Sequence, residues 1–213
     1  MDIIKKIKNF INYKIRDPNS KAFNKFKSYN LTNNSTVVDL GAHDGTISEF
    51  FLKKGCKVFA FEPNPFLYNK LIEKKKIYKN LNCFNLAVNS KKGFFNLYMK
   101  RNEDTQKVKK DSQASSLLIE KYNVTKEDAI KVECITFKEV IVITGKVDLV
   151  KIDIEGAEYE IYNDIIEQSD NFNNCIVELH HKKFPPSMKY KHEDFIKSVE
   201  SHPNKKKFNL DYI

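Results

Sequence analysis

The chain has 213 residues, of which 41% are hydrophobic and 31% are charged. These proportions exclude an intrinsically disordered chain, and the length suits one domain with a sizeable core. No apolar stretch approaches a membrane span, and Lys5, Lys6 and Lys8 interrupt the first apolar residues, which excludes a secretory signal. We therefore expect a cytoplasmic protein.

The formal net charge of +9 could attract nucleic acid, a membrane surface or an anionic substrate. The lysines are spread over several short runs, which favours a solvated surface over a nucleic-acid-binding face. None of the four cysteines belongs to a C-x-x-C pair, so we expect buried reduced thiols and no zinc site.

The first predicted element is a basic amphipathic helix at residues 3–15. Ile3, Ile7 and Ile11 recur at helical spacing between lysines. We expect this helix to pack on the domain; the alternative is a helix on a membrane surface or over the active site. We assign residues 1–34 to this N-terminal helical segment and residues 35–213 to the main domain.

Strand and helix patterns alternate after residue 35. Strands are predicted at 37–40, 58–61, 82–87, 94–99, 131–136, 147–152, 175–179 and 208–213. Five helices are predicted. The first runs from a Thr46–Glu49 capping box to Gly55, and the second runs from Pro65, after an Asn64 cap, through Ile72. The others are predicted at 137–143, around Ile161–Ile166 and at 192–200. This alternation predicts an α/β fold, a doubly wound and mostly parallel sheet with helices on both faces.

Polar residues follow four of the buried strands. They are Asp39-Leu-Gly41, Glu62-Pro63, Asp153-Ile-Glu155-Gly156 and Glu178-Leu-His180. Ligands of open α/β sheets bind outside the carboxyl ends of the strands. We therefore expect these four segments to line one site.

The first two segments indicate a cofactor that contains a nucleoside. Gly41 and Gly45 allow the backbone to approach a ligand, and the helix that follows presents its N-terminal amides. Glu62 has the sequence separation from this loop at which an acidic residue binds ribose hydroxyls. The loop lacks the G-x-G-x-x-G pattern of a pyrophosphate site, and Asp39 suits a ligand with a positive end. S-adenosylmethionine has such an end.

Four segments in this order resemble the FkbM-type S-adenosylmethionine-dependent methyltransferases. They are Val37–Gly45, Phe61–Pro65, Asn85–Val88 and Val147–Glu158. The resemblance implies a class I methyltransferase fold and methylation of a hydroxyl on a sugar, a glycan or a related small molecule. By position it places Asp39, Gly41, Ala42 and Gly45 around the methionine part of the cofactor, Glu62 (with Pro63) at the ribose, Ala87 at the adenine and Asp153 beside the methyl group. His43 stands where the family usually has Asn, and we expect it to contact the cofactor or the substrate without being essential.

Transfer of a methyl group to a hydroxyl needs close positioning and a base that accepts the hydroxyl proton. Asp153 is the first candidate, and His180 is the second because its unperturbed pKa of about 6.5 suits a base. The residues predicted to contact the substrate are Glu155, Glu178, Ser115 and Ser116. Glu155 could instead cap a helix that starts at Gly156.

Three alternatives stay open. Asp153, Glu155, Glu178 and His180 could together bind Mg²⁺ or Mn²⁺, although their spacing does not require it. Lys107, Lys109 and Lys110 could contact an anionic substrate or belong to a solvated loop. The protein could also be an RNA or DNA methyltransferase, or a scaffold subunit that binds the cofactor without catalysis.

Overall fold

The computed structural model describes residues 21–100 and 114–210. The helix predicted at 3–15 and the lysines at 107, 109 and 110 lie outside the described residues. None of the described helices combines the length and the apolar character needed to cross a bilayer.

The main sheet has six strands in the order β3-β2-β1-β7-β8-β9, and every neighbouring pair is parallel. The strands are β1 (Thr36–Leu40), β2 (Lys57–Phe61), β3 (Leu81–Phe84), β7 (Val147–Ile152), β8 (Phe172–Val177) and β9 (Phe208–Asn209). From β1 the chain adds β2 and β3 toward one edge of the sheet, and from β7 it adds β8 and β9 toward the other edge. The topological switch point therefore lies between β1 and β7.

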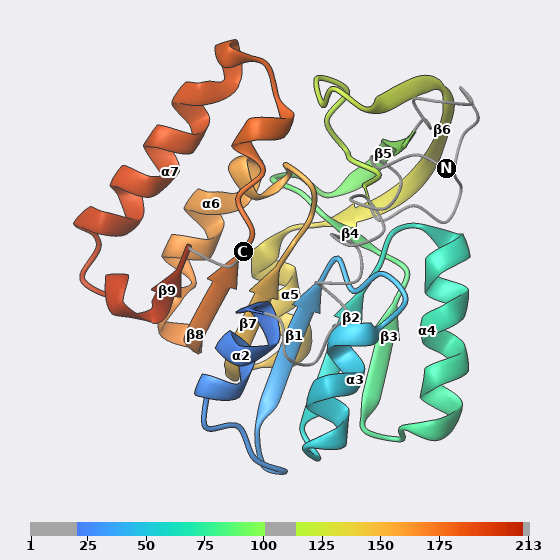
Figure 1. Cartoon of the computed structure of the whole chain (residues 1–213), viewed down its shortest axis with the longest axis vertical. Coiled ribbons are helices and arrows are strands. Elements are labelled where there is room, and N and C mark those ends of the chain that lie inside the picture. Colours follow the sequence, from blue (N-terminus) through green and yellow to red (C-terminus); the bar gives the residue numbers. More distant parts are fainter. Residues whose placement is uncertain (1–20, 101–113, 211–213) are drawn as a thin grey trace, which may run out of the picture.

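Helices cover both faces of this sheet. One face carries α2 (Lys21–Ser28), α3 (Thr46–Lys53) and α4 (Pro65–Ile77), and the other carries α5 (Phe137–Thr144), α6 (Glu158–Glu167) and α7 (Lys189–Ser201). Figure 1 shows α2 and α3 in front of the sheet and α5 behind it. Within the described ranges, four short 3₁₀ helices complete the connections: η1 (Ser169–Asn171), η2 (His181–Lys183), η3 (Pro186–Met188) and η4 (Lys205–Lys207). The predicted doubly wound α/β fold is confirmed.

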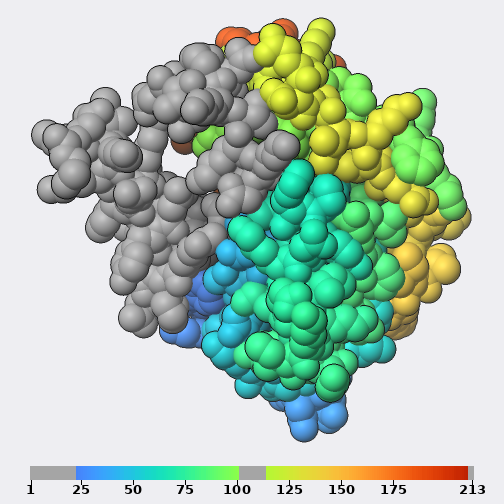
Figure 2. Space-filling model, turned by 90° about the vertical axis from the view of Figure 1, so that its right-hand side faces the viewer, coloured from blue at the N-terminus to red at the C-terminus, as the bar shows by residue number. Residues whose placement is uncertain are grey.

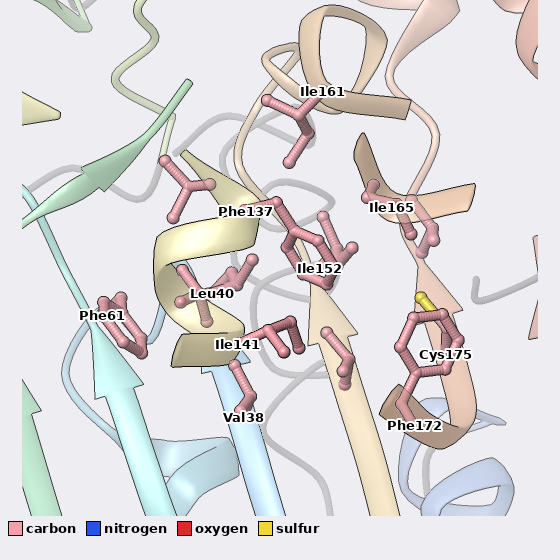
Figure 3. Packing of buried hydrophobic residues seen from close by; sticks show 14 of the residues in the cluster. Val38, Leu40, Phe61, Phe137, Ile141, Ile152, Ile161, Ile165, Phe172 and Cys175 are labelled. Atoms are coloured by element: carbon pink, nitrogen blue, oxygen red, sulfur yellow. The ribbon is translucent and has the colours of Figure 1, made fainter. Parts of the chain in front are cut away.

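Two apolar cores lie on the two faces, because successive residues of a strand point in opposite directions. Val38 packs in the core under α5, α6 and α7 (Figure 3), whereas its neighbour Val37 packs in the core under α2, α3 and α4. Phe23 and Phe26 of α2 are buried in this second core against the Phe50–Phe51 pair of α3. Part of the predicted N-terminal segment therefore packs on the domain, and a boundary at residue 34 stays a prediction.

A second sheet of three strands stands beside the main one. It consists of β4 (Ala87–Val88), β5 (Gly93–Lys100) and β6 (Val124–Ile135), with β5 antiparallel and β4 parallel to β6. In Figure 2 the β6 segment lies above the α4 segment on one side of the molecule. The strand predicted at 82–87 is present as β3 but ends at Phe84, because Asn85 donates hydrogen bonds to the carbonyls of Glu62 and Pro63 and the chain leaves the main sheet there.

The start of α4 agrees with the prediction and the start of α3 does not. Asn64 caps α4 by accepting a hydrogen bond from the Phe66 N–H, with Pro65 as the first helical residue. The capping box predicted for α3 is wrong, because Gly45 takes the cap position and Asp44 Oδ1 accepts from both Thr46 N and Thr46 Oγ1.

The other predicted elements agree with the structure within a few residues, except that α4 extends to Ile77, β6 starts earlier and β9 is shorter than expected. Helix α2 was not predicted.

Candidate active site

A cavity of about 680 Å³ opens at the carboxyl ends of the parallel strands, next to the switch point between β1 and β7. Ligand sites of drug-sized molecules have volumes in this range. Each of the four polar segments contributes at least one residue to its wall. The predicted site residues in the wall are Gly41, Ala42, His43, Glu62, Pro63, Ala87, Ser115, Asp153, Glu155 and Glu178. The predicted convergence of these segments on one site is therefore observed.

The loop after β1 approaches β7 so closely that it requires a glycine. Gly41 has a φ of 72°, and an added Cβ would overlap the carbonyl oxygen of Asp153. Gly41 N and Ala42 N both donate to the carbonyl of Phe61, at 3.0 Å. Gly45 lies outside the cavity wall, and its missing side chain makes room for Leu71 of α4. The two glycines therefore shape the loop in different ways.

Glu62 is fixed in the cavity wall by backbone groups. Its Oε2 accepts from His43 N and its Oε1 from Asn64 N, each at 2.8 Å. Burial raises the pKa of Glu62 to about 7. His43 has a φ of 55°, uncommon for a residue with a side chain, and its ring lines the cavity with Nδ1 3.3 Å from Asp44 Oδ1.

Asp39 is fully buried under this loop and does not line the cavity. Its Oδ2 accepts from Ser48 Oγ at 2.7 Å, and its Oδ1 lies 3.1 Å from Lys151 Nζ. Lys151 also donates to the carbonyl of Gly41 at 2.9 Å. Burial alone would lower the pKa of Lys151, but Asp39 and Asp153 raise it above its usual value, so this lysine stays charged. Asp39 thus supports the loop through Lys151.

Asp153 follows β7 and presents a partly exposed carboxylate to the cavity. Its backbone N donates to the carbonyl of Leu40, and its Oδ2 lies 3.5 Å from Lys151 Nζ. Enclosure by the cavity wall and the nearby carboxylate of Glu178 raise the pKa of Asp153 to about 6.

Glu155 is held by two lysines far from it in the sequence. Its Oε2 accepts from Lys121 Nζ at 2.6 Å and from Lys183 Nζ at 3.1 Å. Burial would raise the pKa of Glu155, but His180 and these lysines lower it to about 2. The predicted helix cap at Glu155 is wrong, because α6 begins at Glu158 and the Glu158 carboxylate accepts from Gly156 N.

His180 is 2% exposed and lies behind the cavity wall. Its Nδ1 lies 2.9 Å from Glu158 Oε1, and its Nε2 faces the carboxylates of Glu178, Glu155 and Asp153 at 3.3, 3.5 and 3.6 Å. Burial lowers the pKa of His180, but Glu158 and the other carboxylates raise it well above its usual value. His180 is therefore unsuited to the predicted role of base, because it contacts carboxylates and holds its proton.

The two candidate serines have different surroundings. Ser115 lines the cavity, whereas Ser116 is buried and its Oγ donates to the carbonyl of Glu155 at 2.8 Å. Ser116 therefore positions the Glu155 backbone, whose φ of 55° is strained, and its predicted contact with substrate does not fit its place.

Sequence reasoning missed four charged residues of the site: Lys121, Lys151, Glu158 and Lys183. Lys151 carried a signal as a lysine in the mostly apolar strand β7, and Glu158 ends the Val147–Glu158 segment of the family resemblance. The partners of Lys121, Glu158 and Lys183 come from segments that are distant in the sequence.

A comparison of the sequence with models of protein families agrees with the geometry of this site. Residues 39–205 match the model of the methyltransferase FkbM domain. The chain belongs to the FkbM methyltransferase family. The matched range starts at Asp39 and contains the whole described cavity wall, and the sheet is that of a class I methyltransferase. A comparison with curated proteins finds no match for this FkbM methyltransferase.

Proposed function

We propose that the protein is an S-adenosylmethionine-dependent O-methyltransferase that methylates a hydroxyl of a sugar, a glycan or a related small molecule. The observation that carries this proposal is the juxtaposition, across one cavity, of Glu62 on one wall and Asp153 on the other. The first can bind a ribose and the second can accept a proton, as transfer to a hydroxyl needs.

The wall formed by the loops after β1 and β2 suits the methyl donor. Glu62 would bind the ribose hydroxyls, while Gly41, Ala42 and His43 would surround the methionine part. Ala87 lies between Leu86 and Val88 in the wall, where an adenine ring finds apolar contacts. Asp39 and Gly45 would act on the donor through the loop that they support.

The wall formed by the ends of β7 and β8 suits the acceptor. S-adenosylmethionine supplies an electrophilic methyl group when it is bound. Asp153 would accept the proton of the hydroxyl as its oxygen attacks, and Lys151 holds the Asp153 carboxylate in place. Glu178 and Ser115 would orient the acceptor by hydrogen bonds from their places in the wall.

Calorimetric titration with S-adenosylmethionine tests the donor assignment. We expect binding in the micromolar range, lost in Glu62→Ala and Asp39→Ala and retained in Glu73→Ala, which removes an exposed carboxylate of α4. Circular dichroism identifies any variant that fails to fold, and Glu62→Gln is the milder replacement. Normal binding in both the Glu62 and the Asp39 variants would contradict the assignment.

A further inference from the structure

His180 presents a buried ring nitrogen to the carboxylates of the cavity wall. Its Nε2 is buried and makes no hydrogen bond to the described residues. It points toward the carboxylates of Asp153, Glu155 and Glu178, all three of which line the cavity. Asp153, Glu155 and His180 each offer one ligand atom, and these atoms lie within 4.8 Å of one another. An ion placed among them can reach all three.

Glu158 orients the ring of His180 as the partner of a metal ligand does. A histidine that binds a metal usually gives its other ring N–H to a carboxylate, which fixes the orientation of the ring. Here the fully buried Glu158 contacts His180 Nδ1 at 2.9 Å and also accepts from His180 N at 3.1 Å. Nε2 is thereby held toward the carboxylates.

The charges around the ring favour a divalent occupant. Lys121 and Lys183 both bond to Oε2 of Glu155, and Lys151 lies closer to Asp39 than to Asp153. Lys151 and Lys183 also act on Asp153 and Glu178. The cluster still holds more carboxylates than lysines, namely Asp39, Asp153, Glu155, Glu158 and Glu178 against Lys121, Lys151 and Lys183. A divalent cation would offset this excess of negative charge.

We propose that Asp153, Glu155 and His180 Nε2, with Glu178 beside them, bind a divalent cation at the cavity wall. One imidazole combined with several carboxylates suits Mn²⁺ better than Mg²⁺, which prefers oxygen ligands alone. The cation can bind two adjacent hydroxyls of the acceptor and lower the pKa of the one that is methylated. This role rests on the proposed function, whereas the cation site itself does not.

Electron paramagnetic resonance measures Mn²⁺ binding without any enzyme assay. The full chain is treated with EDTA, dialysed and titrated with Mn²⁺. We expect one bound Mn²⁺ per chain, with affinity reduced at least about tenfold in His180→Gln and about 10–100-fold in Glu158→Gln, as for losses around other metal sites. The matched control is His181→Gln, because the adjacent His181 stacks on His192 and lies outside the cluster.

Two results would overturn the cation site. One is wild-type protein that does not bind Mn²⁺, and the other is Mn²⁺ affinity that His180→Gln leaves unchanged. If His180→Gln fails to fold, Glu178→Gln replaces it, because Glu178 lies in the cavity wall and its loss is expected to weaken Mn²⁺ binding. Calorimetry with S-adenosylmethionine on the same metal-free protein reports separately on the proposed function.

Discussion

The two walls of the cavity are held together by different forces. The wall after β1 and β2 is fixed by the backbone, through the positive φ of Gly41 and His43 and the two N–H groups that hold Glu62. The wall after β7 and β8 is fixed by charged side chains, as in the pairs Lys121–Glu155 and His180–Glu158. We call the wall after β1 and β2 the backbone-built wall and the wall after β7 and β8 the charge-built wall. The first has a fixed shape that suits a constant ligand, and the second concentrates reactive groups. Lys151 joins the two, since it contacts Asp39 and Asp153.

Removing Lys151, which links the two walls, should cause the largest loss of unfolding free energy. Lys151→Met leaves the buried Asp39 carboxylate without its counter-charge, and breaking a buried pair in this way costs about 3–5 kcal/mol of unfolding free energy. Urea denaturation measures the loss. The double variant Asp39→Asn with Lys151→Met should be more stable than Lys151→Met alone, because the unpaired charge is gone. Equal stability of the two variants would show that the pair does not couple the walls.

Gly41→Ala breaks the backbone-built wall at its closest approach to the other. We expect a loss of about 2–5 kcal/mol of unfolding free energy, because overpacking costs about 1–3 kcal/mol and left-handed backbone costs about 1–2 kcal/mol more. Gly145→Ala is the matched control, with a φ of 71° and no atom within 4 Å of an added Cβ. Thermal unfolding should show only the cost of the strained backbone there, about 1–3 kcal/mol, because no overlap adds to it. Similar losses at the two sites would refute the close approach.

The pH dependence of stability tests the environment of Glu62. Its folded pKa of about 7 exceeds the ordinary value of 4.5, so the folded chain keeps a proton that the unfolded chain releases between these pH values. Stability due to this proton is present below pH 4.5 and is lost as the pH rises through about 7, a change of about 3 kcal/mol.

Glu62→Gln cannot titrate, so its stability relative to wild type should rise by that amount from acid to neutral pH. Denaturation curves of both proteins across this range measure the difference. A difference that is independent of pH would contradict the burial of Glu62.

The smallest expected effects distinguish Ser115, which lines the cavity, from the buried Ser116. Ser116→Ala removes the hydrogen bond to the Glu155 carbonyl and should cost about 1 kcal/mol of unfolding free energy. Ser115→Ala should leave stability within about 0.5 kcal/mol and raise the KM for the acceptor. If only Ser115→Ala lowered the free energy of unfolding, the roles assigned to the two serines would be wrong.

The sequence predicts the backbone-built wall better than the charge-built one. The strand at 58–61 is recognisable because its residues are apolar, and Gly41 is recognisable because a tight turn after a strand requires it. The two-residue strand β4 could not be predicted, because it depends on the side chain of Asn85 and on pairing with β6.

The partners of Glu155 and His180 could not be predicted, for one physical reason. Each side chain is engaged by partners outside its own segment, Lys121 and Lys183 for Glu155 and Glu158 for His180. A residue pattern along the chain indicates which groups reach the strand ends, but it does not indicate which of them pair. Pairing decides whether a histidine is free to act as a base.

Mass spectrometry of an acceptor panel tests the central claim most directly. Nucleotide sugars, glycans and RNA are incubated with S-adenosylmethionine and either wild-type protein or Asp153→Asn. We predict that a hydroxyl compound from the sugar classes gains the mass of one CH₂ group with the wild type and gains much less with Asp153→Asn. Methylation of RNA alone, or equal methylation by both proteins, would contradict the account.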